Sequence, residues 1–170
     1  MLLPYTICFC RCGDKLLMLY RNYPPNRYRW NGLGGKIHVG ETPLECIQRE
    51  ILEEANIDLH RATLLRFAGI VTWPVGADST IPSRGMYAFI ADLPTNWPTW
   101  EGHCMVSEGI LCWKNVEWVC DKQNREVASN IPHFLPHMLS ETNPTEYACD
   151  YQDERLVSIA IRPLSGYSAV

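Results

Sequence analysis

The sequence has no apolar run long enough to span a bilayer and no block of like charges. Its 170 residues include 15 basic and 19 acidic side chains, which give a net charge of −4. Arg11, Asp14 and Lys15 interrupt the apolar N-terminal region. A membrane-spanning helix needs about 20 apolar residues in succession, and proteins that wrap duplex DNA carry a basic excess. We therefore expect neither a membrane protein nor a binder of nucleic-acid polymers.

The sequence also lacks the features of an exported or zinc-binding protein. The opening MLLPYTICFCRC has no basic segment before its apolar residues, so we expect a cytoplasmic protein. Eight cysteines would suggest a disulfide framework in a short secreted chain, but this chain shows no export signal. None of the cysteines forms a CxxC pair, which argues against a zinc site. Cys8, Cys10 and Cys12 alternate along a predicted strand, so we interpret them as reduced structural thiols.

Strand and helix patterns interleave along the chain. Alternating or apolar runs predict strands around the turn at residues 12–14, over 62–73 and over 85–93, and the last two are separated by a polar loop at 74–84. Residues 110–119 resemble a short strand followed by a turn. Residues 129–139 predict a short helix that its prolines keep brief or distorted, and about 145–163 a terminal hairpin. With 46% apolar residues, the pattern predicts a single α/β domain over 1–170.

The clearest helix in the sequence begins after Thr42. The run Thr-Pro-Leu-Glu is a capping box, with Thr42 as N-cap, Pro43 as the first helical residue and Glu45 as the third. Apolar residues recur every three or four positions and form one face: Leu44, Ile47, Ile51 and Ala55. Asn56 suits a left-handed exit. The pattern predicts a helix over 43–55.

Three carboxylates lie on one side of this helix, beside its apolar face. The spacing i, i+3, i+4 places Glu50, Glu53 and Glu54 within a sector of about 100°. Such a cluster repels itself unless a cation lies among the oxygens, and oxygen ligands suit Mg²⁺ or Mn²⁺. Mg²⁺ commonly bridges carboxylates and phosphates, so the cluster favours phosphoryl chemistry. The alternative to a metal site is that these carboxylates form a solvated helix face. Arg49 is four residues from both Glu45 and Glu53, so we expect it to orient a carboxylate.

Residues 35–57, GKIHVGETPLECIQREILEEANI, resemble the signature of the Nudix hydrolases. The matching positions are Gly35, Glu41, Arg49, Glu50, Ile51, Glu53, Glu54 and Ile57, while Asn56 replaces a glycine. The resemblance implies an α/β/α sandwich with a mixed sheet and a loop–helix–loop signature. It also implies cleavage of a nucleoside diphosphate linked to another moiety, with metal ligands from Glu50, Glu53, Glu54 and the carbonyl of Gly35.

The run Trp30-Asn31-Gly32-Leu33-Gly34-Gly35-Lys36 resembles a segment of the MutT-like 8-oxo-dGTP diphosphatases, in which the Asn reaches the purine. That resemblance implies sanitation of the nucleotide pool. It also implies a further metal-binding Glu outside the signature, for which residues 107–113 nominate Glu108, with Glu101 as the alternative. Asn130 lies where MutT-like proteins carry a residue that reads the base.

Aromatic and basic side chains are expected to complete the substrate site. A flat ring can stack on a base, which makes Trp30 and Phe134 candidates for substrate binding, with Trp73 as a third. Core packing is the alternative interpretation for Phe134 and Trp73. Lys36 and Arg21 are expected to steer phosphates towards the metal.

The leading hypothesis is a Mg²⁺-dependent pyrophosphohydrolase, with Mn²⁺ as a possible substitute, that acts as a monomer or homodimer. It would cleave nucleoside triphosphates such as 8-oxo-dGTP to the monophosphate and pyrophosphate, using Glu53, Glu50 and Arg49 as catalytic residues. Pro74, seventeen residues after Ile57, favours ADP-ribose or another nucleoside-diphosphate-linked substrate instead. A nucleotide-sensing domain without catalysis is the alternative from another class, and the intact run REILEE argues against it.

Overall fold

A computed structural model describes residues 3–75, 83–153 and 155–164 of the chain. The helices are α1 (Pro43–Ala55), the short 3-10 helix η1 (Leu59–Arg61), α2 (Val116–Cys120) and α3 (Ile131–Ser140). The strands are β1 (Tyr5–Cys12), β2 (Lys15–Arg21), β3 (Trp30–Asn31), β4 (Leu64–Pro74), β5 (Ser83–Asp92), β6 (Cys104–Val106), β7 (Gly109–Asn115), β8 (Thr145–Gln152) and β9 (Arg155–Pro163). None of these helices is long and apolar enough to cross a membrane.

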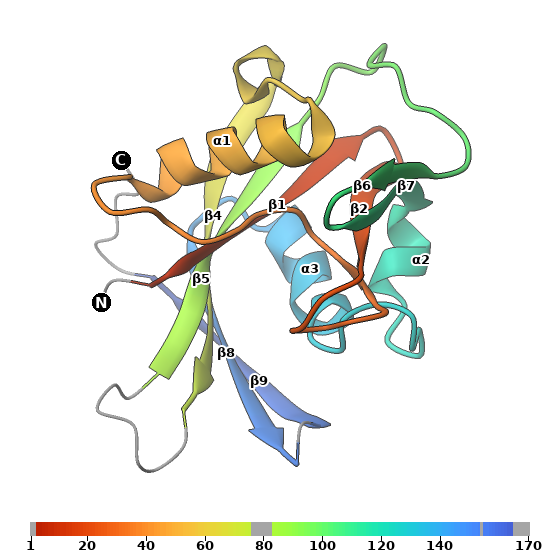
Figure 1. Cartoon of the computed structure of the whole chain (residues 1–170). Coiled ribbons are helices and arrows are strands. Elements are labelled where there is room, and N and C mark those ends of the chain that lie inside the picture. Colours follow the sequence, from red (N-terminus) through yellow and green to blue (C-terminus); the bar gives the residue numbers. More distant parts are fainter. Residues whose placement is uncertain (1–2, 76–82, 154, 165–170) are drawn as a thin grey trace.

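The strands form one mixed sheet in the order β6-β7-β2-β1-β5-β4-β8-β9, and β3 pairs with β2. β1 pairs with β5 and β4 with β8 in parallel, whereas the other neighbours are antiparallel. Helix α1 covers one face of this sheet and α3 lies on the other (Figure 1). The α/β/α sandwich implied by the sequence is therefore confirmed.

Two apolar clusters fill the space on either side of the sheet. Ile7 and Phe9 of β1 belong to the cluster with α3, and Cys8 and Cys10 belong to the cluster with α1. This alternation is that of a strand covered on both faces. Cys12 also lies on the α1 side. All eight cysteines are free thiols, in agreement with the interpretation of them as mostly reduced.

Helix α1 has the predicted bounds because its sequence specifies both ends. Thr42 Oγ1 accepts a hydrogen bond from the Glu45 N–H at 3.2 Å, and the Thr42 N–H donates to Glu45 Oε2 at 2.8 Å. Asn56 ends the helix in the left-handed conformation, with φ 54°. Cys46, Ile47 and Ile51 are its buried residues. The helix therefore presents an apolar stripe to the sheet and leaves the acidic side beside it.

Three predictions outside α1 need correction or completion. The turn expected after the strand at 110–115 is the helix α2, which Asn115 caps by accepting a hydrogen bond from the Glu117 N–H at 2.8 Å. Pro136 lies inside α3, which nevertheless runs for ten residues. The terminal hairpin spans 145–163 as predicted, although Glu154 of its turn, and residues 76–82 of the loop at 74–84, lie outside the described residues.

Candidate active site

The glycine-rich loop at residues 32–36 is bound to the edge of β1. Cys8 and Leu33 exchange main-chain hydrogen bonds at 2.7 and 3.1 Å, and the Thr6 N–H donates to the Gly35 carbonyl at 2.8 Å. A Cβ on Gly35 would lie 2.4 Å from Cδ of Glu50. A side chain at this position would require the Glu50 carboxylate to move, so the main chain of the loop lies directly against a carboxylate of α1.

Arg49 lies at the centre of the signature and binds three of its carboxylates. Its guanidinium donates to both oxygens of Glu41 at 2.8 and 3.0 Å. It also donates to Glu50 Oε1 at 2.7 Å and to Glu53 Oε2 at 3.3 Å. The bonds from Arg49 lower the pKa of Glu41 to about 2, and the same pairing raises the pKa of Arg49 further. This network fixes the orientation of the acidic side of α1.

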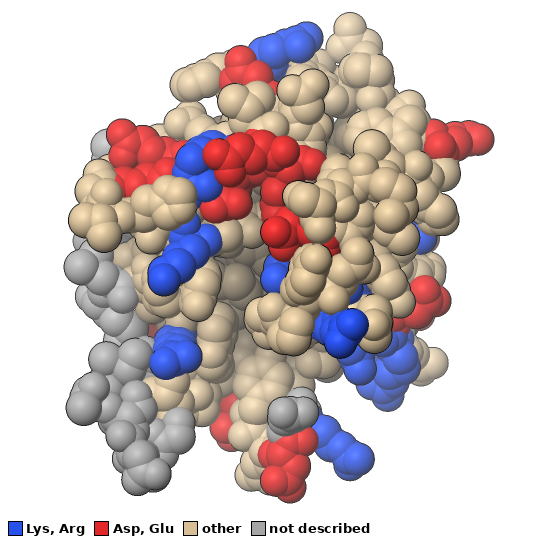
Figure 2. Space-filling view, viewed as in Figure 1, with Lys and Arg blue, Asp and Glu red and all other residues tan. Residues whose placement is uncertain are grey.

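Glu54 is the buried member of the acidic cluster. Its Oε2 accepts a hydrogen bond from the Gly34 N–H at 3.1 Å. The pKa of Glu54 is raised to about 8, mainly by burial and also by the negative charges of Glu50 and Glu108, while the hydrogen bond from Gly34 and the charge of Arg21 act in the opposite direction. These charges therefore lie close together although they come from α1, β2 and the turn before β7. Acidic side chains gather over α1 and just below it, with basic side chains lower on the same face (Figure 2).

The donor set fits a hard divalent cation. Glu50, Glu53, Glu54 and the Gly35 carbonyl offer oxygen ligands, which Mg²⁺ and Mn²⁺ prefer. Burial, together with the charges of Glu50 and Glu108, raises the pKa of Glu54, and a bound cation would favour its carboxylate form. Among the described residues, however, no three acidic, His or Cys side chains already surround one point. Glu50 and Glu53 face Arg49 instead, so a cation would compete with this guanidinium for them.

The other polar residues expected in the site lie in two places. Asn31 in β3 is half-buried, with its Oδ1 accepting from the Gly32 N–H at 3.1 Å, and Lys36 is exposed, with its carbonyl accepting from Arg49 at 3.2 Å. Asn31 directly precedes the glycine-rich loop and Lys36 is its last residue. Asn130 begins α3, is only 8% exposed, and directs its amide to Cys149 of β8 at 4.0 Å. Its position links it to the α3 side of the sheet.

Two of the three aromatic candidates, Phe134 and Trp30, are buried. Phe134 is 0% exposed, and its ring packs against Phe9 and Tyr147 with centroids 6.0 and 5.6 Å apart. Trp30 is 6% exposed and packs against Tyr20 at 5.2 Å, with the ammonium of Lys114 4.3 Å from its ring centre. A buried ring offers no free face to a base. In the structure, Phe134 and Trp30 therefore take part in packing, and stacking on a substrate base stays a prediction for both.

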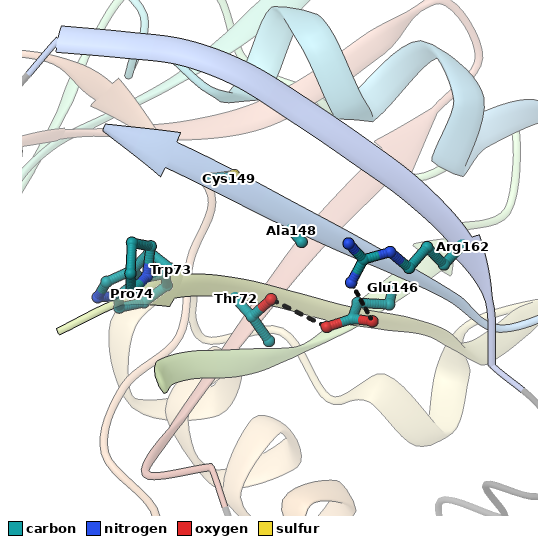
Figure 3. Close-up of a pocket in the computed structure, with 7 residues that line it drawn as sticks. All are labelled: Thr72, Trp73, Pro74, Glu146, Ala148, Cys149 and Arg162. Atoms are coloured by element: carbon teal, nitrogen blue, oxygen red, sulfur yellow. Dashed lines mark hydrogen bonds and ion pairs between the residues drawn. The ribbon is translucent and has the colours of Figure 1, made fainter. Parts of the chain in front are cut away.

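A separate groove of about 260 Å³ lies at the β4–β8–β9 end of the sheet (Figure 3). Glu146 accepts a hydrogen bond from Thr72 Oγ1 at 3.1 Å and pairs with Arg162 at 3.7 Å. Pro74, on which the ADP-ribose alternative rested, lines this groove together with Trp73. Since the groove contains no residue of the signature, the position of Pro74 does not strengthen that alternative.

Sequence reasoning missed two buried polar residues behind the glycine-rich loop, Thr6 and Cys46. Thr6 is 4% exposed and Cys46 0% exposed, and their Oγ1 and Sγ atoms are 3.3 Å apart. Burial raises the pKa of Cys46 to about 11, so it remains a neutral thiol. The two residues are forty positions apart, and neither occupies one of the matching positions of the signature. The alternation of β1, which places Thr6 on the face of Cys8, was the only sequence signal available.

A glycine-rich loop against a helix that carries clustered carboxylates, on a mixed-sheet sandwich, defines a hydrolase of pyrophosphate bonds. The model of the NUDIX domain matches residues 2–137, and the chain belongs to the Nudix hydrolase family. It is 30% identical over 135 residues to the uncharacterized Nudix hydrolase YvcI of Bacillus subtilis, covering 79% of this chain and 77% of the relative. Nudix hydrolases generally use divalent metals, in agreement with the oxygen donors on α1.

A second group of relatives is represented by the NAD-capped RNA hydrolase NudC of Haemophilus influenzae. The identity is 32% over 152 residues, which cover 86% of this chain and 51% of the relative. The chain thus spans about half the length of NudC.

Solved structures share the fold. A MutT protein of Bacillus halodurans superimposes with a TM-score of 0.72 at 23% identity, over 94% of this chain and 97% of that chain. A MutT protein of Methanosarcina mazei gives a TM-score of 0.57 at 19% identity, over 82% and 96% of the two chains.

Proposed function

We propose that this Nudix hydrolase cleaves purine nucleoside triphosphates, among them 8-oxo-dGTP, to the monophosphate and pyrophosphate with Mg²⁺ as its metal. The observation that carries the proposal is the contact of two α1 carboxylates with the glycine-rich loop: Glu54 accepts a hydrogen bond from the Gly34 N–H, and Glu50 lies against Gly35. Glu108 and Arg21 are near enough for their charges to act on Glu54. Clustered carboxylates can hold a metal ion, and a positively charged side chain next to them can bind the phosphates of a polyphosphate substrate. Such an enzyme would act on the free nucleotides of the cytoplasm and remove oxidised ones.

Within this proposal, Glu50, Glu53, Glu54, Glu108 and the Gly35 carbonyl would hold the metal. The metal would activate a water and neutralise charge on the phosphoryl oxygens. Glu53 has 61% of its side chain exposed, compared with 15% for Glu50. We assign Glu53 to accept the proton of the attacking water, because its carboxylate is open to solvent. Arg49 keeps the carboxylates oriented through its hydrogen bonds.

The substrate would lie across the glycine-rich segment. Lys36 is exposed and Arg21 half-buried, so both can donate to phosphate oxygens. The Asn31 amide offers both a donor and an acceptor to a purine edge. We also assign Asn130, at the start of α3, to hydrogen bonds with the edge of the base. To make this contact, its amide would have to give up its contact with the Cys149 thiol.

The likeness to NudC favours a second candidate function. That relative is named for hydrolysis of NAD-capped RNA, and NAD contains a pyrophosphate between two nucleosides. The same metal chemistry would then act on a dinucleotide or on ADP-ribose. Compared with hydrolysis of a nucleoside triphosphate, only the protein groups that bind the part of the substrate beyond its pyrophosphate would differ.

A comparison of kcat/KM with Mg²⁺ for 8-oxo-dGTP, dGTP, NAD and ADP-ribose separates these possibilities. The proposal predicts the highest value for 8-oxo-dGTP, and a loss of about tenfold in Asn31→Ala, since one amide contact to the base is removed. Asn143→Ala, an exposed change in the turn before β8, serves as the matched control. Preference for NAD or ADP-ribose supports the second candidate. Saturable nucleotide binding without any product identifies a sensing domain instead.

A further inference from the structure

Behind the proposed metal site, β1 and α1 face each other through two polar side chains. Thr6 and Cys46 are both buried next to the Gly35 carbonyl, with Oγ1 3.5 Å and Sγ 4.0 Å from its oxygen. Buried polar groups are normally hydrogen-bonded, because an unpaired one costs the full penalty of desolvation. The partners of Thr6 and Cys46 therefore show what these residues stabilise.

The partners form a continuous chain of contacts. Nη2 of Arg49 donates to Cys46 Sγ at 3.6 Å, and this sulfur lies 3.3 Å from Thr6 Oγ1. Thr6 Oγ1 is 3.5 Å from the Gly35 oxygen, to which the Thr6 N–H also donates at 2.8 Å. The guanidinium can donate a hydrogen bond to the thiol, the thiol can donate one to the hydroxyl, and the hydroxyl can donate one to the carbonyl. Such a chain is cooperative in a low-dielectric interior.

We propose that Thr6 and Cys46 are positioning residues that fix the Gly35 carbonyl and the Arg49 guanidinium relative to each other. This inference rests on the proposed metal site, because Gly35 and the carboxylates held by Arg49 are its assigned ligands. Groups that orient metal ligands from behind commonly contribute 10–100-fold to metal affinity. Thr6 and Cys46 would thus tune the metal affinity without touching metal or substrate.

Mn²⁺ binding to the protein without nucleotide, followed by electron paramagnetic resonance, tests this role. Thr6→Val keeps the shape of the side chain and removes its hydroxyl, and Cys46→Ala removes the thiol. Each is expected to raise the Kd for Mn²⁺ about tenfold and to raise the Mg²⁺ concentration for half-maximal turnover similarly. Thr6→Ser and Cys46→Ser, which keep a hydrogen-bonding hydroxyl, should restore most of the affinity.

Three controls separate positioning from packing. Cys112→Ala removes another buried thiol, in β7, and should leave the Kd unchanged. Thermal melting reports any general loss of stability in each variant. Glu53→Gln shows whether the bound Mn²⁺ is the one held by α1.

The outcomes distinguish this inference from the proposed function. If wild-type protein binds Mn²⁺ through Glu53, but Thr6→Val and Cys46→Ala bind it within twofold of wild type, the positioning role is overturned and the metal site stands. A reduced affinity that serine does not restore also overturns it, since packing alone would explain the loss. If wild-type protein binds no Mn²⁺, the metal site and the positioning role both fall.

Discussion

At the scale of single residues, Arg49 and Glu41 form the best-defined ion pair of the signature. The hydrogen bonds from Arg49 lower the pKa of Glu41 from 4.5 to about 2. Because the folded protein has the lower pKa, the pair stabilises the fold fully above about pH 5, and this contribution is lost as the pH falls towards 2.

Glu41→Gln should therefore lower the free energy of unfolding at pH 7 by about 1–2 kcal/mol. The difference from wild type should shrink between pH 5 and pH 3, where Glu41 loses its charge in the unfolded chain first. Urea unfolding at pH 7, 5 and 3.5 measures it, with the exposed change Glu101→Gln as control. If the difference in the free energy of unfolding between wild type and Glu41→Gln stays constant with pH, the charge of Glu41 does not contribute to stability.

The residues of the signature could be predicted because their spacing is local. Glu50, Glu53 and Glu54 lie within five positions, and one helix fixes their directions. Thr6 and Cys46 meet only through the packing of β1 on α1, which no local pattern encodes. For the same reason, periodicity could not decide whether Phe134 faces a base or the core.

At the scale of elements, the turn between β6 and β7 carries Glu108 to the site. Gly109 follows it with φ 153°, and a Cβ there would lie 1.9 Å from the Tyr20 carbonyl oxygen of β2. The Asn22 N–H donates to the Glu108 carbonyl at 3.0 Å. The direct contact of two main chains thus determines where Glu108 lies.

Gly109→Ala is expected to push the start of β7 away from β2 and displace Glu108. Because Glu108 is an assigned metal ligand, kcat/KM should fall by about tenfold or more. Steady-state kinetics over a Mg²⁺ series measures this. Gly102→Ala is the matched control, since it also has a positive φ, of 83°, but its Cβ would meet nothing within 4 Å. Equal kinetics in both variants would argue against a role for Glu108.

Elements with strong end signals were predicted best. The capping box and Asn56 gave α1 its bounds, and the alternating residues of 145–163 gave the terminal hairpin. Helix α2 was missed because five residues are too few to show a helical period.

At the scale of the whole molecule, a substitution of Phe134 shows whether this residue belongs to the hydrophobic core or to the substrate site. It is fully buried between Phe9 and Tyr147 on the α3 side of the sheet. Phe134→Ala should cost about 3–5 kcal/mol of stability through the cavity it leaves, while the KM of the folded fraction stays near that of wild type. Phe134→Leu, which keeps an apolar side chain, should lose less.

Urea unfolding and steady-state kinetics at low temperature together measure both effects. A large rise in KM with unchanged stability in Phe134→Ala would return this residue to the substrate site.

The sandwich itself could be predicted from the sequence, but the order of its strands could not. Parallel pairing of β4 with β8 joins residues more than seventy positions apart, and the alternation of apolar residues is the same for any order of strands. The sheet order nevertheless matters for function, because it brings β2, β7 and β1 together next to α1. Through this arrangement Arg21 and Glu108 lie near Glu54 of α1, and Thr6 lies next to Cys46 of α1.

The most direct test of the account is the Mg²⁺-dependent product analysis of 8-oxo-dGTP with wild-type protein and Glu53→Gln. We expect monophosphate and pyrophosphate in equal amounts, no turnover after chelation of the metal, and a loss of at least about 100-fold in Glu53→Gln with unchanged thermal stability. Wild-type turnover in Glu53→Gln, or turnover that survives chelation, would contradict the assignment of the α1 carboxylates to a catalytic metal site.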